Sequence, residues 1–361
     1  MRSVTMAAGI LVLSLGAYSA VTMVAQRAVA AEPQDIRGPM PAHGAPVPTS
    51  TSSQQQSQKQ QIPSAQQQLK VQTNLVNVFV TVRDKHHNIV SNAGKDEFKV
   101  YEDGVEQKIA YFSKDMNLPI TLGLLVDTSG SQDRLLSAEQ ETASRFLKEV
   151  MRPKDLAMVM SFDTDANLLA DFTEDTGVLN RAIQRTQINA PAVGAGGTAG
   201  TIPDPDPKGT VLYDAVYLAC HDELSSEAGR KAIILLTDAE DQGSKLSLND
   251  AIESAQRADT VIHVLLLADP GGYFGFGMGY TGGAVAQRMA EATGGRVINV
   301  HNEKSLEKAF DEISEELRSQ YVIGYYPSNT KHDGTFRKIE VKVNRPDTKA
   351  LARRGYYAPA R

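Results

Sequence analysis

Apolar runs and amphipathic stretches alternate through the middle of the chain, from residue 118 to about residue 320. Short apolar runs typical of strands buried on both faces occur at residues 122–126, 155–162, 231–237, 260–269 and 296–300. Stretches with helical spacing of apolar residues separate them, at 135–150, 212–226, 247–258, 284–295 and 305–320. Residues 166–173 predict an antiparallel neighbour of the strand at 155–162. The alternation predicts an α/β domain with a doubly wound, mostly parallel sheet.

Strand patterns flank this region on both sides. An apolar pattern with a period of two follows residues 76–82, and another follows residues 339–343. A hairpin with its turn at residues 102–104 is predicted between 95 and 114. Neither the segment 71–117 nor the segment 321–361 holds enough strands to be stable alone. We therefore expect both to pair into one β-sandwich, into which the domain of residues 118–320 is inserted.

The first 70 residues have a different character. Residues 1–31 are typical of a secretory signal, with a basic start at Arg2, a mostly apolar run over 6–24 and a small-residue cleavage site at 28–30. An uncleaved membrane anchor is the alternative, but the polar residues and the glycine in the run favour cleavage. Residues 32–70 are rich in Pro, Ser, Thr and Gln, which predicts a disordered linker.

This N-terminal region predicts an exported protein that is periplasmic, secreted or associated with the cell surface. No later stretch has the length and apolarity of a transmembrane helix, so no integral span is expected after signal cleavage. The net charge of −6 and the pI near 5.7 argue against a nucleic-acid surface. The single cysteine, Cys220, excludes an internal disulfide, and its place on the apolar stripe of a helix predicts a buried side chain rather than a nucleophile.

Three oxygen-bearing side chains follow the first apolar run of the α/β region. Asp127, Ser129 and Ser131 are spaced as D-x-S-x-S, and the helical stretch of residues 135–150 begins just afterwards. The segment therefore lies at the C-terminal edge of the predicted sheet, where open α/β sheets bind ligands. One carboxylate and two hydroxyls are suited to a hard divalent cation, Mg²⁺ before Ca²⁺.

The segment Asp127–Ser131, DTSGS, resembles the metal-ion-dependent adhesion site of von Willebrand factor type A domains. In that family a threonine and an aspartate from two later loops complete the site, and Thr210 and Asp238 stand at the matching places. Two positions depart from the pattern of many relatives, which have glycine there. Lys208 adds a positive charge near the proposed cation, and Ala239 costs little unless its backbone needs a positive φ.

The C-terminal segment carries a second resemblance. Its layout of YVIGYYP, DGTFRKIEVKV and RRGYYAP is similar to the tail of a group of exported bacterial proteins that carry this type A domain and are well represented in acidobacteria. The likeness covers nearly everything after the linker, and it bears on architecture more than on role.

The first resemblance implies how the site works. Ser129, Ser131 and Thr210 would contact the metal, whereas Asp127 and Asp238 would act through bound waters. One coordination position would stay open for an Asp or Glu side chain of a partner protein. The expected function is that of a divalent-metal-dependent protein-binding module, for adhesion or as a scaffold, with Mg²⁺ as cofactor and Mn²⁺ or Ca²⁺ as alternatives.

Two other functions stay open. A metal-dependent hydrolase would need a general base beside the metal, for which Asp241 is a candidate, but none of the three metal loops contains a histidine. A non-catalytic assembly subunit of an envelope complex would use the same site with a different partner. The pattern favours binding over catalysis, so no catalytic residue is assigned.

Several further features receive plainer interpretations. The long, glycine-rich loops 188–209 and 269–283 are expected to flank the metal edge, where they either contact a ligand or pack on the sheet. The pair His86-His87 predicts an exposed turn rather than a metal site. His221 and His263 fall within a helix and a strand, and are expected to be structural.

Overall fold

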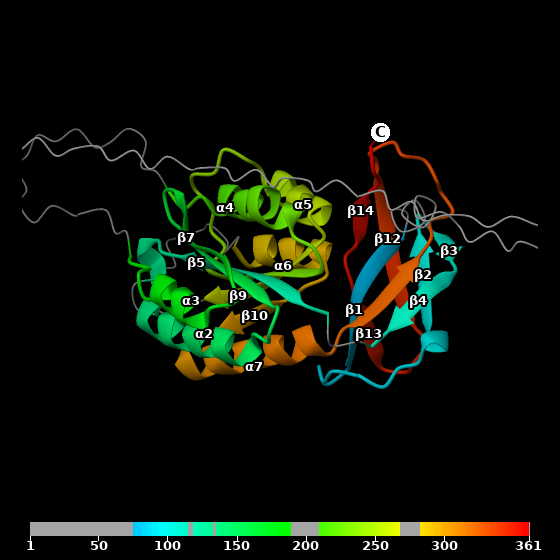
Figure 1. Cartoon of the computed structure of the whole chain (residues 1–361), viewed down its shortest axis with the longest axis horizontal. Coiled ribbons are helices and arrows are strands. Elements are labelled where there is room, and N and C mark those ends of the chain that lie inside the picture. The colour runs from blue at the N-terminus through cyan, green and yellow to red at the C-terminus, as the bar shows by residue number, and fades with distance from the viewer. Residues whose placement is uncertain (1–74, 115–117, 133–134, 189–208, 268–281, 361) are drawn as a thin grey trace, which may run out of the picture. The chain divides into compact units, whose positions relative to one another are not determined.

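The computed structural model describes residues 75–114, 118–132, 135–188, 209–267 and 282–360 (Figure 1). The predicted signal at 1–31, the linker at 32–70 and residues 71–74 lie outside the described residues. The same holds for Lys208 and for nearly all of the loops 188–209 and 269–283. No helix among the described residues is long and apolar enough to cross a membrane.

The middle of the chain forms a six-stranded sheet with the order β10-β9-β8-β5-β6-β7. All neighbours are parallel except β7, which runs antiparallel to β6. The strands are β5 (Ile120–Asp127), β6 (Leu156–Phe162), β7 (Ala166–Thr173), β8 (Arg230–Thr237), β9 (Thr260–Leu267) and β10 (Val297–Val300). Every residue of β5 and of β9 is buried, as the continuous apolar runs predicted. The predicted mostly parallel α/β sheet is confirmed.

Helices cover both faces of this sheet (Figure 1). One apolar core joins a face of the sheet to α2 (Leu136–Val150), α3 (Thr176–Ile183) and α7 (Glu303–Arg318). The other joins the opposite face to α4 (Leu212–Leu218), α5 (Leu248–Arg257) and α6 (Gly282–Thr293). A short π turn (Ala219–Glu223) and a 3₁₀ turn (Leu224–Ser226) continue from α4. Because helices cover both faces, polar residues open to a ligand lie at the edges of the sheet.

Side-chain caps explain where three of these helices begin. Asp175 accepts hydrogen bonds from the backbone N–H groups of Gly177 and Val178 at the start of α3. Ser247 forms a capping box with Asp250 at the start of α5. Asn302 accepts from the N–H of Ser305 and caps α7.

The flanking segments form two four-stranded sheets that each combine strands from both ends of the chain. Their orders are β13-β1-β11-β4 and β14-β12-β2-β3. The strands are β1 (Val76–Asp84), β2 (Phe98–Glu102), β3 (Val105–Gln107), β4 (Ile109–Ser113), β11 (Tyr321–Tyr325), β12 (Phe336–Val343), β13 (Thr348–Leu351) and β14 (Gly355–Tyr357), and a 3₁₀ turn spans Lys95–Glu97. The predicted β-sandwich of paired flanking strands is confirmed.

The sandwich differs from the prediction in two details. The predicted hairpin after residue 95 is shorter than expected, because only β2 and β3 pair across the turn at Asp103-Gly104, and β4 then joins the other sheet beside β11. Asp103 and Gly104 both have positive φ, +49° and +83°, which suits a two-residue turn. Strand β13 was not predicted, because its sequence TKAL has no clear alternation of apolar residues.

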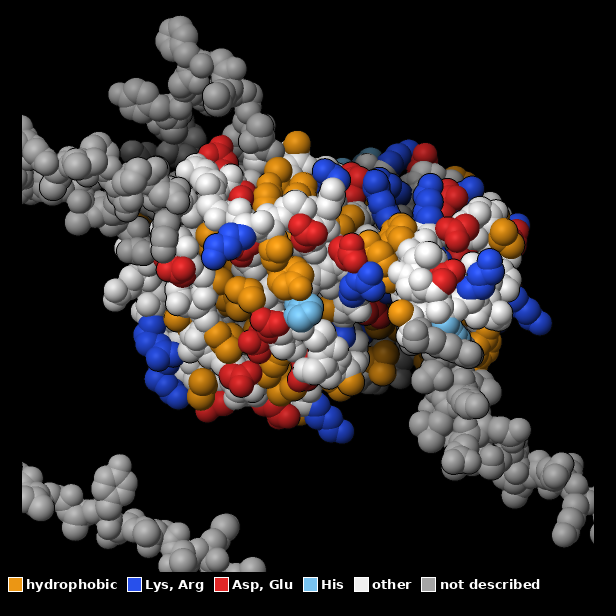
Figure 2. All heavy atoms as spheres, turned by 90° about the horizontal axis from the view of Figure 1, so that it is seen from above, with side chains coloured by type: hydrophobic (Ala, Val, Ile, Leu, Met, Phe, Trp, Pro, Cys, Tyr) orange, Lys and Arg blue, Asp and Glu red, His pale blue; other side chains and the backbone are white. Residues whose placement is uncertain are grey.

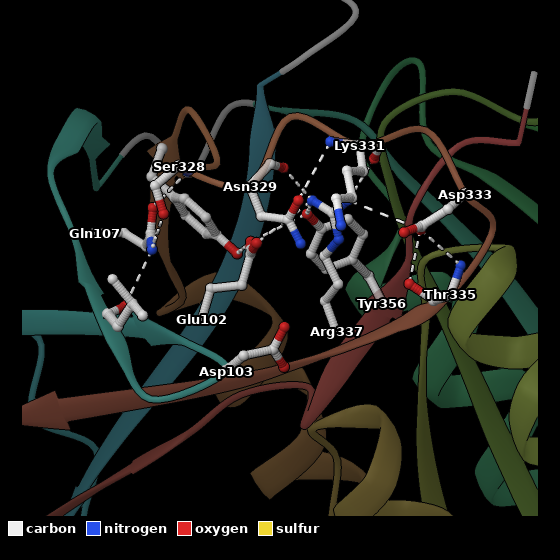
Figure 3. A network of polar contacts seen from close by, with 12 residues as sticks. Glu102, Asp103, Gln107, Ser328, Asn329, Lys331, Asp333, Thr335, Arg337 and Tyr356 are labelled. Carbon is white, nitrogen blue, oxygen red and sulfur yellow. Dashed lines mark hydrogen bonds and ion pairs between the residues drawn. The ribbon is translucent and has the colours of Figure 1, made fainter.

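One face of β12 departs from its apolar pattern at a single position. Arg337 lies in line with Ile339 and is equally buried, with only 2% of its surface exposed. Its guanidinium lies 3.5 Å from the buried carboxylate of Glu102 and also donates to the backbone carbonyls of Asn329 and Lys331 (Figure 3). The hydroxyl of Tyr356 donates to the same carboxylate at 3.0 Å. The network thus holds the connection between β11 and β12 against the end of the sandwich.

Tyr321 joins the two ends of the chain inside the sandwich. Its ring is fully buried and packs 5.1 Å from the ring of Phe98, centroid to centroid. Its hydroxyl accepts from the backbone N–H of Ala93 at 2.8 Å and donates to the carbonyl of Val90 at 2.9 Å. One phenol therefore satisfies two backbone groups of the N-terminal segment.

Replacing Tyr321 with phenylalanine should lower the free energy of unfolding by about 1–2 kcal/mol, because the N–H of Ala93 and the carbonyl of Val90 lose their partner in a buried place. Urea denaturation of the full chain measures the change. Tyr111→Phe serves as the matched control, since that side chain is 45% exposed. An equal effect of the two substitutions would contradict the assignment.

Candidate functional site

Asp127, the first predicted site residue, ends β5 and is completely buried. One of its carboxylate oxygens accepts from the backbone N–H of Ser129 at 3.0 Å, and the other accepts from the hydroxyl of Thr237 at 2.6 Å. Burial raises the pKa of Asp127 to about 6, and the charge of Asp238 acts in the same direction, against the lowering effect of these hydrogen bonds. Hydrogen bonds thus hold both carboxylate oxygens of Asp127 in place.

Ser129 and Ser131 stand on the turn that follows. Their hydroxyl oxygens lie 3.0 Å apart, and residues 130–132 form a single 3₁₀ turn. The side-chain amide of Gln132 donates to the hydroxyl of Ser131 at 2.9 Å and to the carboxylate of Asp238 at 3.2 Å. The D-x-S-x-S spacing therefore brings the two hydroxyls together, as predicted.

Thr210 reaches the same place through a close contact between two backbones. The N–H groups of Gln242 and Gly243 both donate to the carbonyl of Thr210, at 3.0 and 3.1 Å. A Cβ on Gly243 would lie 2.4 Å from the carbonyl oxygen of Gly209, so only glycine fits there. Thr210 itself is 9% exposed. The glycines set the loop of Thr210 directly against the loop that follows Asp238.

Asp238 follows the last residue of β8 and accepts from the N–H of Glu240 at 3.1 Å. The next residue, Ala239, has a φ of +59° and is buried. A residue with a Cβ in this left-handed region costs about 1–2 kcal/mol, so the departure from glycine does carry a penalty here. Gly282, at the start of α6, packs so closely that a Cβ there would lie 2.2 Å from the carbonyl oxygen of Asp238.

The three loops surround one hollow of about 350 Å³. Four of the five predicted residues line it, namely Ser129, Ser131, Thr210 and Asp238, and the rest of the described lining is Gly130, Asp163, Thr164, Gly209, Glu240 and Gln242. Asp127 lies behind the turn and reaches the hollow through its bond to Ser129. The structure therefore brings all five residues to one end of the sheet.

This donor set fits a hard cation. All five side chains offer oxygen, three as hydroxyls and two as carboxylates, which is the chemistry that Mg²⁺ prefers. No group of three or more His, Cys, Asp or Glu side chains able to hold a metal occurs among the described residues. A metal at this site would therefore depend on the hydroxyls as well as on the two carboxylates.

Three residues of the site were missed by sequence reasoning. Thr237 lies beside Asp127 because β5 and β8 pair with Val126 opposite Leu236. Knowledge of this strand register would have been needed to predict the contact. Gln132 directly follows DTSGS, but its amide had no evident target before Asp238 was placed. Asp163, at the end of β6, accepts from the hydroxyl of Thr128 at 2.9 Å and lines the hollow. Its position directly after β6, the strand that pairs with β5, could have indicated that it lies near Asp127.

Glu139 of α2 is a further unexpected group near the site. It is 1% exposed, and within the described part of the chain neither carboxylate oxygen has a hydrogen-bond partner. Burial, and then the charge of Asp127, raise the pKa of Glu139 to about 8. The side chain is therefore mostly protonated at neutral pH.

The other residues considered as candidates lie outside the hollow. Asp241 accepts from the hydroxyl of Ser244 and from the N–H of Tyr213, and it is not among the residues that line the hollow. Cys220 is fully buried, which raises the pKa of its thiol far above the ordinary value. His263 is buried in β9, and His86 and His87 lie in an exposed turn.

Charge is mixed on the molecular surface seen in Figure 2. Acidic and basic side chains are mixed there with apolar and uncharged ones, and the described residues on that face form no broad area of a single sign.

Comparison with known proteins finds a match within the α/β region. Residues 122–240 match the family model described as von Willebrand factor type A domain. No curated protein matches the chain.

Several solved structures are similar in fold. BatB, a conserved hypothetical protein from Bacteroides thetaiotaomicron, is 22% identical over 55% of this chain and 100% of its own, with a TM-score of 0.41. A von Willebrand factor type A structure from Catenulispora acidiphila is 12% identical over 79% of this chain and 74% of its own, with a TM-score of 0.42. Proximal thread matrix protein 1 from the mussel byssus, in a structure with a zinc-occupied MIDAS motif, is 12% identical over 60% of this chain and 49% of its own, with a TM-score of 0.45.

Proposed function

We propose that the protein is an exported module that binds partner proteins through a divalent cation. The premise is the match of residues 122–240 to a von Willebrand factor type A domain. The observation that carries the proposal is the hollow lined by Ser129, Ser131, Thr210 and Asp238, with Asp127 behind it. Oxygen donors from three separate loops converge there.

The contacts of each residue support distinct roles toward the cation, with Mg²⁺ as the first candidate and Mn²⁺ or Ca²⁺ as alternatives. Ser129, Ser131 and Thr210 would hold it directly. Asp127 would orient bound waters, because its two oxygens already accept from Ser129 and Thr237. Asp238 would do the same from the opposite loop. The bound cation would supply electrostatic attraction for a carboxylate at an open coordination position.

The partner that fits this site is a protein presenting an Asp or Glu side chain. The described lining of the hollow contains Asp163, Asp238 and Glu240, so a carboxylate would be repelled from it without the cation. Recognition should therefore depend on the metal. The N-terminal region, with its signal pattern at 1–31 and its linker at 32–70, supports a role outside the cytoplasm, either as an adhesion or scaffold module or as an assembly subunit of an envelope complex.

A metal-dependent hydrolase is the alternative from another class. Such an enzyme needs a general base beside the metal-bound water. Asp241, the candidate from the sequence, is bonded to Ser244 and Tyr213 instead of lining the hollow. Asp241 therefore has no place beside a metal-bound water in the hollow.

Titration of the purified chain with MgCl₂, MnCl₂ or CaCl₂ tests the proposal by calorimetry. We expect one site per chain and a higher melting temperature with bound metal, because a ligand that binds only the folded state stabilises it. Asp127→Asn should weaken the binding by at least about tenfold, since it removes a negative charge behind the cation. Asp222→Asn, on an exposed residue of the π turn, should leave it unchanged.

The partner is tested by capture from an envelope extract with Mg²⁺ and with chelator. Metal-dependent capture by the wild type, lost in Asp127→Asn, is the expected result. Absence of heat and of any rise in melting temperature with all three metals would overturn the proposal. Turnover of phosphate esters or peptides that disappears in Asp127→Asn would favour the hydrolase.

A further inference from the structure

We infer that Gln132 is a positioning residue of this site, whose amide ties Ser131 to Asp238 and aims their oxygens at the cation. The inference rests on the proposed function, because it assigns a role toward the same metal. It concerns a residue that follows the D-x-S-x-S segment and supplies none of its five donors.

The amide of Gln132 lies where two loops of the site meet. The side chain is 2% exposed, and its nitrogen donates to the hydroxyl of Ser131 at 2.9 Å and to the carboxylate of Asp238 at 3.2 Å. An amide nitrogen has two hydrogens, so both are used in these bonds. The amide oxygen in the same place would face a carboxylate oxygen and be repelled, which fixes the orientation of the group.

The bond to Ser131 determines which lone pairs remain available. A hydroxyl oxygen has two acceptor lone pairs and one hydrogen. When Ser131 accepts from Gln132 and donates to Ser129, whose oxygen is 3.0 Å away, each serine keeps one lone pair for the cation. The amide therefore sets the direction of a short chain of hydroxyls.

The backbone around Gln132 prevents the amide from drifting. Its N–H donates to the carbonyl of Ser129 at 3.0 Å, and its own carbonyl accepts from the N–H of Leu135 at 3.0 Å. The side chain thus extends from the same turn that carries both serines and reaches the loop after β8. The amide of Gln132 therefore links the loop of Ser131 to the loop of Asp238.

The link made by the Gln132 amide should contribute more to the affinity for Mg²⁺ than to the affinity for Ca²⁺. Mg²⁺ demands nearly ideal octahedral geometry at about 2.0–2.1 Å, whereas Ca²⁺ accepts variable geometry at about 2.3–2.6 Å. Freely turning Ser131 and Asp238 side chains would still serve the larger ion. Loss of the amide should therefore change the preference between the two ions as well as the affinity.

Gln132→Met tests this in the full chain, because methionine keeps the length of the side chain and removes the amide donors. Gln140→Met is the matched control: that amide donates at 3.0 Å to the hydroxyl of Thr186, on the α2–α3 side of the sheet, and touches none of the five donors. Calorimetric titration with MgCl₂ and with CaCl₂ gives both affinities, and melting in chelator gives the stability of each variant without metal.

We expect Gln132→Met to weaken Mg²⁺ binding by about 10–100-fold, the usual effect of losing a residue that orients a metal ligand, and Ca²⁺ binding by a clearly smaller factor. Gln140→Met should bind both ions as the wild type does. Unchanged or tighter Mg²⁺ binding in Gln132→Met, or an equal loss for both ions, would overturn the inference. If the wild type itself binds neither ion, the proposed function fails first, and the two failures are thereby distinguished.

Discussion

Replacing Arg337 with methionine should lower the free energy of unfolding of the β-sandwich by about 3–5 kcal/mol, because it leaves a carboxylate buried without its cation. Glu102 is 2% exposed and lies 3.5 Å from the guanidinium. The substitution also removes the donor to the backbone carbonyls of Asn329 and Lys331 (Figure 3). Urea denaturation followed by tyrosine fluorescence measures the loss, since the chain has 12 tyrosines and no tryptophan.

A second substitution separates the charge from the packing. In the double variant Arg337→Met/Glu102→Leu only part of the stability should return. The uncompensated buried charge is gone, but the hydroxyls of Tyr325 and Tyr356 lose their shared acceptor. Arg345→Met is the matched control, since Arg345 pairs with Glu97 at 2.8 Å but both side chains are more than a quarter exposed. That control should cost about 1 kcal/mol or less. A loss below about 1 kcal/mol for Arg337→Met would contradict the role of the pair.

Glu139→Gln should make the protein more stable than the wild type at alkaline pH, by about 2–5 kcal/mol at pH 9. The pKa of Glu139 is raised from its ordinary 4.5 to about 8 in the folded chain. The folded state therefore keeps a proton that the unfolded chain loses, and this stabilisation is complete below pH 4.5 and is lost as the pH rises through 8. Each pKa unit is worth about 1.4 kcal/mol, which gives the upper limit.

The glutamine cannot ionise, so the two stability curves should converge near pH 5 and separate as the pH rises. Denaturation is measured in chelator, which keeps divalent metal away from Asp127. Glu141→Gln, an exposed position on the same helix, should run parallel to the wild type. Parallel curves for Glu139→Gln would show that its carboxyl titrates normally.

The sequence was informative wherever a single repeating rule governed many residues. The continuous apolar runs of β5, β8 and β9 predict strands that are covered on both faces. The alternation of apolar and polar residues in β12 predicts a strand that is covered on one face only. The pairing of the flanking segments followed because neither holds enough strands by itself. Of the candidate site, Asp127, Ser129 and Ser131 were predicted from their spacing after an apolar run, and Thr210 and Asp238 from the resemblance to type A domains.

What could not be predicted depends on contacts across long distances in the chain. Arg337 breaks the apolar pattern of its strand, and only the position of Glu102 in the neighbouring strand explains it. Glu139 has helical spacing that places it among buried residues, yet nothing local distinguishes it from an exposed glutamate. The positive φ of Ala239 likewise has no signal in the local sequence, and α6 packs closely on the same loop through Gly282.

The pairing of β1 has a consequence for the order of events during biosynthesis. Both of its neighbours, β11 and β13, are encoded after the whole α/β domain. At about 5–20 residues per second, a ribosome needs on the order of 10–50 s to reach them. Throughout that interval the valine-rich strand has two unsatisfied edges, so it is the stretch that a holding chaperone would need to protect until the last strands emerge.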